Sequence, residues 1–214
     1  MLKTARLQLV LPILILLSAC SDAPKTDKAK EPAKPPEPVT GRQAFQKMYP
    51  MARNWDLNAA TLRLRSVRLS AKPEKGKADA WEAIFVSQSL GKSKTFTYSV
   101  VEAEGNLHQG VFALLEEGYT PQGAASPFPI AAIKFDSDQA YDVAAEKSAD
   151  YIKKNPDKPI TYLLEQTRRF PDLTWRVIWG ESVSTSDYSV FVDASTGKYL
   201  EKAHGAFVRT MPPC

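Results

Sequence analysis

The chain contains two segments that follow the same pattern, and this internal repeat is the strongest restriction on how it can fold. Each segment begins with a capping residue, a Gln and an aromatic residue: Thr40, Gln43 and Phe45 in the first, and Asp136, Gln139 and Tyr141 in the second. This pattern is typical of a helix start, because the cap and the Gln can each bond the other's backbone N–H group. We therefore expect two equivalent helices, which end near Trp55 and Lys154.

The sequences of the two predicted helices differ in one respect. In the second helix, Ala140 and Tyr151 belong to an apolar stripe at helical spacing, and the following Asn155-Pro156 ends the helix. The first helix contains Pro50, and a proline lacks an N–H group and clashes with the preceding turn. We expect the first helix to bend or to stop early at this residue.

Strands with matching sequences follow each helix. The predicted strands are 61–69 and 160–168, 80–86 and 174–179, 96–101 and 188–192, and a last one that starts after Gly105 or Gly197 and ends near Phe112 or Phe207. The second and third pairs share Trp-x-x-Ile and Tyr-Ser-Val sequences. Apolar and cationic residues alternate along 61–69, which predicts a half-buried strand with a basic outer face. The order predicts an α+β fold of two repeated units, each a helix followed by an antiparallel β-meander of three to four strands.

The end of the second unit has a distinctive sequence. Residues 188–200 form a strand that ends in Asp-Ala-x-Thr-Gly-Lys and is followed by a second strand. Asp193 can bond the backbone two residues further on, and Gly197 can adopt a left-handed conformation, which predicts a tight turn. This hairpin resembles the closing hairpin of PepSY and PepSY-like domains, and the match covers about 136–207. The first unit keeps Gly105 but departs from the Asp-Ala-x-Thr signature.

The N-terminus has the three parts of a secretory signal. Lys3 and Arg6 precede an almost unbroken apolar run over 9–17, which is followed by small residues and Cys20. A transmembrane anchor needs about 20 apolar residues, roughly twice the length of this run. Leu17-Ser18-Ala19-Cys20 resembles the lipobox of bacterial lipoproteins; the alternative is an ordinary cleaved signal with an incidental cysteine. The resemblance implies that Cys20 is lipidated, with a diacylglyceryl group and usually a third chain such as palmitate, and begins the mature protein.

Two further features concern where the protein is held. In enteric lipoproteins an Asp directly after the cysteine retains the protein in the inner membrane, and this chain has Ser21 there. The resemblance therefore implies a lipid anchor in the outer membrane, facing the periplasm. Residues 20–40 are rich in Pro, Lys, Ala and Glu, a composition that cannot bury enough apolar surface to fold and that favours an extended spacer.

These features divide the chain into five parts. We expect a lipoprotein signal peptide at 1–19, a tether at 20–40, a first α+β repeat at 41–118, a connecting loop at 119–135 and a second, PepSY-like repeat at 136–214. Cys214 is the only cysteine left once Cys20 carries lipid, so no internal disulfide can form in the mature chain. We expect the Cys214 thiol to be exposed on a mobile terminus.

The sequence lacks the motifs that would indicate catalysis, metal binding or nucleic-acid binding. It has no Gly-x-Ser-x-Gly, no His-Glu-x-x-His and no phosphate-binding glycine loop, so we expect a protein that is not an enzyme and needs no cofactor. His108 and His204 fall at equivalent places but lack the companion ligands of a metal site, and no metal is expected. The formal net charge of +4 comes with no basic stripe, which argues against a nucleic-acid partner.

The aromatic residues of the predicted strands allow two interpretations. Trp81, Trp175 and Trp179 are a candidate binding surface if they line a concave face of the sheet. In the alternative, they belong to the core between the helices and the sheet.

A binding role is the function that this sequence favours. The PepSY resemblance implies inhibition or assembly of a partner, which here would be an envelope protein or peptide. We expect a membrane-anchored periplasmic module that captures an extended peptide by strand addition, without catalysis. The alternative is a small-ligand or metal sensor that uses the cleft between the repeats.

Overall fold

A computed structural model describes residues 36–69, 75–121 and 125–205 of the chain. Its elements are β1 (Val39–Thr40), α1 (Gly41–Trp55), β2 (Ala60–Val67), β3 (Lys77–Ala78), β4 (Ala80–Ser87), β5 (Lys92–Ser99), β6 (Gly110–Gly118), β7 (Ala125–Ser126), a 3₁₀ turn (Ile130–Ala132), α2 (Ser137–Lys147), α3 (Ala149–Lys154), β8 (Ile160–Thr167), β9 (Thr174–Trp179), β10 (Tyr188–Asp193) and β11 (Tyr199–His204). The predicted signal peptide, Cys20, most of the tether and Cys214 lie outside the described residues. Val39 and Thr40, which we assigned to the tether, pair with β3 instead.

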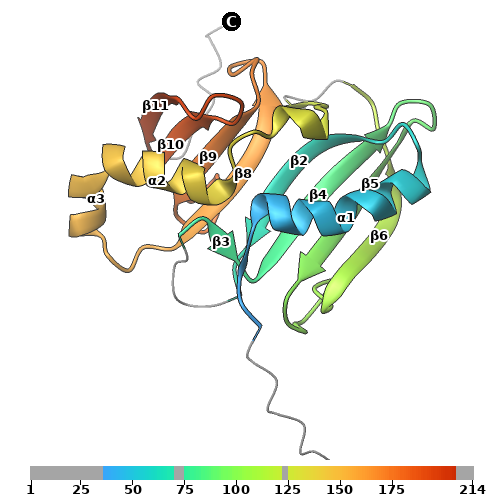
Figure 1. Ribbon diagram of the computed structural model, residues 1–214, viewed down its shortest axis with the longest axis horizontal. Helices are drawn as coiled ribbons and strands as arrows, with labels where there is room; N and C mark the ends of the chain where they lie inside the picture. Colours follow the sequence, from blue (N-terminus) through green and yellow to red (C-terminus); the bar gives the residue numbers. More distant parts are fainter. Residues whose placement is uncertain (1–35, 70–74, 122–124, 206–214) are drawn as a thin grey trace, which may run out of the picture. The chain divides into compact units, whose positions relative to one another are not determined.

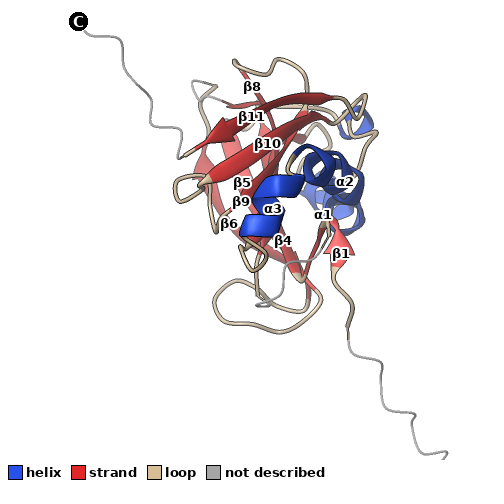
Figure 2. Ribbon diagram, turned by 90° about the vertical axis from the view of Figure 1, so that its left-hand side faces the viewer, coloured by secondary structure: helices blue, strands red, loops and turns tan. Residues whose placement is uncertain are grey.

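The long strands belong to one antiparallel sheet (Figure 1). The nine-stranded sheet has the order β11-β10-β9-β8-β2-β4-β5-β6, and β7 pairs with β8 off this path. Helix α1 packs on β4 and β5, whereas α2 packs on β9 and β10. Both helices lie on the same face of the sheet (Figure 2), and one continuous apolar core joins them to it. The fold is therefore α+β, with a large antiparallel sheet and few helices.

Helix α1 ends at Trp55, as predicted, and the early stop that we considered at Pro50 does not occur. The helix continues through Pro50. Pro50 and Gln46, whose carbonyl loses its helical partner at the proline, are both exposed, so water can satisfy that group. Met48 and Ala52 on the opposite side are fully buried, and their packing stabilises the helix across the proline.

The second predicted helix is divided at Ser148, which sequence periodicity did not predict. The backbone of Ser148 has φ −125° and ψ 15°, outside the helical range. Its hydroxyl lies 3.2 Å from the Tyr188 hydroxyl, and both residues are buried. This contact to β10 stabilises the break between α2 and α3.

The first turns of α1 and α2 meet, and their caps are bonded to each other. Each cap forms the predicted reciprocal box with the Gln three residues later. The Asp136 carboxylate accepts from the Thr40 hydroxyl at 2.5 Å and from the Arg42 N–H at 2.8 Å, and the Gly41 N–H donates to Ser137 Oγ at 2.8 Å. We call these five residues the helix joint. Because a helix N-terminus carries positive partial charge, one buried carboxylate stabilises both helices.

A tryptophan from the sheet supports each helix start in the same way. Trp81 of β4 donates its ring N–H to the carbonyl of Val39, and Trp175 of β9 donates to the carbonyl of Phe135; both distances are 2.9 Å. Each acceptor directly precedes a helix cap. The two helix starts are thus held by equivalent bonds.

The predicted connecting loop at 119–135 contains a short strand that joins the two halves of the sheet. Direct pairing of β2 with β8 covers only 63–65 and 163–165. Beyond this point β7 pairs with the end of β8, and Phe128 forms a bridge with Thr61 of β2. Phe128 is fully buried, so the connection fills the space where β2 and β8 separate.

Most of the predicted strands are found, with two corrections. The last strand of the first half, expected to end near Phe112, runs instead from Gly110 to Gly118; Phe207, the expected end of its counterpart, lies outside the described residues. The outer face of β2 is not simply basic. Arg63 lies 2.9 Å from Glu165 and Arg65 lies 2.7 Å from Glu82, because acidic residues on the flanking strands face the arginines.

The predicted turn between β10 and β11 is confirmed. The Asp193 carboxylate accepts from the N–H groups of Ser195 at 2.7 Å and Thr196 at 3.0 Å. Gly197 has φ +71°, and a Cβ there would lie 2.5 Å from the Phe135 ring. Only glycine fits this turn without strain.

Candidate functional site

The tryptophans proposed as a binding surface lie in the core. Trp81 and Trp175 are 0 % exposed and Trp179 is 1 % exposed. They occupy positions of β4 and β9 that face the helices, where burial of a large ring contributes most. The binding-surface interpretation is therefore corrected, and the core alternative describes all three residues.

The two histidines are not brought together. His108 precedes β6 and His204 ends β11, and these strands are the opposite ends of the sheet. Within the described ranges, no three His, Cys, Asp or Glu side chains are grouped to hold a metal ion. A groove with a volume of about 470 Å³ lies between α1, the start of β2 and the connecting segment; it is lined by residues that include Tyr49, Phe128 and Ile130, but by neither histidine and by no residue of the second half.

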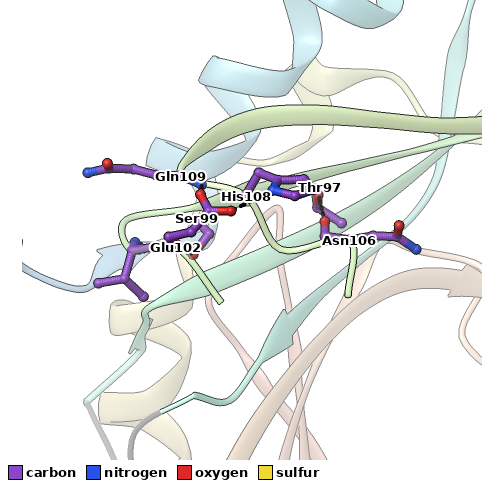
Figure 3. A network of polar contacts seen from close by, with 7 residues as sticks. Thr97, Ser99, Glu102, Asn106, His108 and Gln109 are labelled. Atoms are coloured by element: carbon purple, nitrogen blue, oxygen red, sulfur yellow. Dashed lines mark hydrogen bonds and ion pairs between the residues drawn. The ribbon is translucent and has the colours of Figure 1, made fainter. Parts of the chain in front are cut away.

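His108 belongs to a hydrogen-bonded loop between β5 and β6 (Figure 3). The Glu102 carboxylate lies 2.6 Å from His108 Nδ1 and accepts from the Gln109 N–H at 2.9 Å. The Thr97 hydroxyl donates to the carbonyl of Asn106 at 2.7 Å. These bonds fix the backbone that leads into β6. A carboxylate beside an imidazole is also an acid–base pair, but both side chains are about half exposed or more, at 64 % and 47 %, which is an ordinary surface setting.

The loop is expected to loosen at acid pH. The N–H of Gln109 and then the His108 ring hold the pKa of Glu102 below its usual range. A carboxyl group with a lowered pKa in the folded chain contributes stability above its unfolded pKa, and this contribution is lost as the pH falls through the folded value. We expect exchange protection of the Gln109 amide, corrected for intrinsic rate, to fall as the pH drops below the usual pKa range of a glutamate, and Glu102→Gln to remove this pH dependence. A protection factor that stays constant through this range would contradict the assignment.

Strand β6 forms one open end of the sheet and carries a highly exposed apolar side chain. It is an end strand, and no other strand of the described residues pairs with its outer edge. Its pairing with β5 shifts register between Lys94 and Phe96, as at a β-bulge. Leu115, next to this shift, is 89 % exposed and is the most exposed large apolar side chain of the described residues.

Contacts with neighbouring elements fix the far half of β6. Glu116 lies 3.7 Å from Lys92 and 3.8 Å from Lys94, and it accepts from the Trp55 ring N–H at 2.8 Å. The edge is thus held in an extended conformation before any partner binds. The sequence prediction ended this strand too early, although Gly118 marked its true end.

No family model, curated protein or solved structure matches the chain. In the described part of the chain, no helix has both the length and the apolar character needed to cross a membrane.

Proposed function

We propose that the chain is a lipid-anchored protein of the bacterial envelope that binds an extended segment of a partner protein, without catalysis. The anchor is Cys20, and we place it in the outer membrane with the folded part facing the periplasm. The observation that carries the binding role is the open edge of β6. No strand of the described residues pairs with the outer edge of this nine-residue strand, so alternate residues direct backbone N–H and C=O groups outward.

The chemistry of β6 indicates what kind of segment binds. Leu115 offers an apolar contact at the edge. Glu117 is exposed and has no ion pair among the described residues, whereas Glu116 is paired with lysines of β5. A segment with an aliphatic residue and a basic residue complements this pattern. Backbone bonds would supply the affinity, and the two side chains would supply the specificity.

We further propose that the folded part consists of two PepSY-like units derived from one ancestor. Both units have a capping box, a tryptophan bond to the residue before the cap, and strands that follow the helix. The first strands of the units, β2 and β8, pair antiparallel at the centre of the sheet. This arrangement supports a duplication, and it explains how one edge of each unit is covered while β6 and β11 remain at the ends.

The lipid anchor contributes to the proposed binding. A single contact with one strand edge is weak, because an isolated strand pair is only marginally stable. Holding the module and its partner at one membrane surface raises their effective concentration. A weak, reversible contact then suffices.

A small-ligand sensor is the second candidate, and the groove near Phe128 is the observation that favours it. The groove includes apolar and aromatic side chains and Arg53, which suits a small amphipathic molecule. The metal version of this proposal lacks support, because the histidines lie at opposite ends of the sheet.

Site-specific photocrosslinking in intact envelopes tests the primary proposal. We expect a photoreactive residue at position 115 to crosslink to one partner, and Glu117→Lys to reduce this product by about tenfold, as reversal of one charge contact predicts. The matched control is position 57, because Leu57 is also largely exposed, at 69 %, but lies in the loop after α1. Equal products at both positions, or a product that Glu117→Lys leaves unchanged, would argue against binding at β6. Crosslinks from β6 to β6 would instead indicate self-association.

A further inference from the structure

Arg176 is a buried cation on the face of the sheet opposite the helices. Its neighbours Trp175 and Val177 on β9 face the core, so the side chain of Arg176 projects to the other face. Arg176 is only 7 % exposed. Burial of a guanidinium is unfavourable unless the charge is compensated.

No carboxylate of the described residues forms an ion pair with Arg176. Arg176 Nε donates to Ser189 Oγ at 3.1 Å and Nη2 donates to Ser186 Oγ at 3.3 Å, and both acceptors are neutral. The guanidinium also lies 5.3 Å from the centre of the Phe191 ring. Burial lowers the pKa of Arg176, and the nearby Glu165 only partly opposes this effect.

The remaining donors of Arg176 are free to bind. A guanidinium has five N–H donors, and the two serine bonds occupy one on Nε and one on Nη2. Nη1 has no hydrogen-bond acceptor among the described residues. If Nη1 were also fully buried, it would be a buried nitrogen without a hydrogen-bond partner, and among the described residues it is not one of these. It therefore reaches accessible surface. The free N–H groups of Nη1 and Nη2 form the end of the fork that binds a carboxylate in two places.

Arg176 is one of the residues that line a cavity. The cavity has a volume of about 130 Å³ and is bounded by Glu165, Thr167, Arg169, Phe170, Thr174, Arg176 and Phe191. The other charges at its wall are already paired, Glu165 with Arg63 and Arg169 with Glu201. The single uncompensated charge is therefore that of Arg176. Phe170 and Phe191, stacked with their centres 4.6 Å apart, supply an apolar wall.

The position of β4 that corresponds to Arg176 also carries a charged residue, but there the charge has an ionic partner. Glu82 follows Trp81 as Arg176 follows Trp175. Glu82 is compensated, because Arg65 donates to both of its carboxylate oxygens at 2.7 and 2.9 Å. Only in β9 does this position carry a charge without an ionic partner within the described residues.

We propose that the cavity binds a monoanionic carboxylate with an attached apolar group. The carboxylate accepts from Nη1 and Nη2 of Arg176, and the apolar group packs against Phe170 and Phe191. One unpaired cation matches one negative charge, which favours a carboxylate over a doubly charged phosphate. The ligand is either a small free carboxylate or the carboxyl end of a peptide, and this site is independent of the β6 edge.

Thermal unfolding of the full chain in detergent tests the proposal. The probes are benzoate for a free carboxylate, N-acetylphenylalanine for a peptide end, and N-acetylphenylalaninamide as the neutral control. We expect a carboxylate at about 100 times its Kd to raise Tm by roughly 5 °C or more, and the amide to have no effect. A larger shift with benzoate would indicate a small metabolite, and a larger shift with N-acetylphenylalanine would indicate a peptide end.

Variants separate binding from a structural role. Arg176→Lys keeps the positive charge but loses the planar pair of N–H donors that binds both carboxylate oxygens, and Arg176→Gln loses the charge as well. We expect each variant to weaken carboxylate binding by about tenfold or more. Arg65→Gln on the same face is the matched control and should bind normally. Without ligand, Arg176→Met should unfold at or above the wild-type Tm, because it removes an uncompensated buried charge. No carboxylate effect on the wild type, or an equal effect on Arg176→Gln, would overturn the proposal.

Discussion

Replacing Asp136 with alanine is expected to lower the free energy of unfolding by about 3 kcal/mol or more. The carboxylate is 8 % exposed and bonds the Thr40 hydroxyl and the N–H groups of Arg42 and Ser137. Alanine would leave these donors without their acceptor at the point where two helix N-termini meet. Because α1 covers β4 and β5 and α2 covers β9 and β10, the loss affects both halves of the sheet.

Denaturant unfolding followed by circular dichroism measures this effect. Asp136→Asn should cost less than alanine, because the amide oxygen can still accept from the backbone N–H groups. The matched control is Asp142→Ala on the exposed side of α2, for which a change within about 0.5 kcal/mol is expected. If Asp136→Ala were as mild as the control, the helix joint would not stabilise the fold.

The second large effect is expected at Cys20. In the proposed function Cys20 carries the lipid, and Cys20→Ser removes the thiol that the proposal needs. Two or three acyl chains anchor a protein far more firmly than one, at about 0.8 kcal/mol per buried methylene. We therefore expect almost all of the protein to move from the membrane fraction to the soluble fraction of broken cells, and mass spectrometry to find the lipid only on the wild type.

A neighbouring substitution provides the control for the anchor. Ser21→Asp should leave the lipid in place and move the protein from the outer to the inner membrane, because Asp at this position retains enteric lipoproteins there. If Cys20→Ser still sedimented with membranes after a high-salt wash, Cys20 would not be the anchor. Loss of lipid without any change in sedimentation would indicate a second membrane contact.

Local signals in the sequence were sufficient for the helix starts and for the last turn, but not for every helix and strand boundary. The reciprocal caps at Thr40 and Asp136 and the turn at Asp193 form as predicted, because each depends on residues within a few positions of one another. Pro50 was misinterpreted, since the burial of Met48 and Ala52 outweighs the local effect of the proline. This packing is a tertiary property that helix propensity does not contain.

The candidate sites depended on contacts that the sequence does not show. The tryptophans satisfied the criteria for either a surface or a core, and only the position of the helices decided between them. The opening at β6 depends on which strand ends the sheet. Arg176 was not selected from the sequence, because a missing charge partner becomes visible only when the neighbouring strands are placed. A charged residue between Trp175 and Val177, in a strand that contains no other charge, was the available signal.

Hydrogen exchange of the purified complex tests strand addition most directly. The partner segment that crosslinks at position 115 is added to the full chain, and amide exchange is compared with and without it. We predict slower exchange at alternate residues of 110–118, since only every second N–H of an edge strand points outward, and no change at β11. Protection confined to the groove around Tyr49 and Phe128, or no protection of β6, would contradict binding by strand addition.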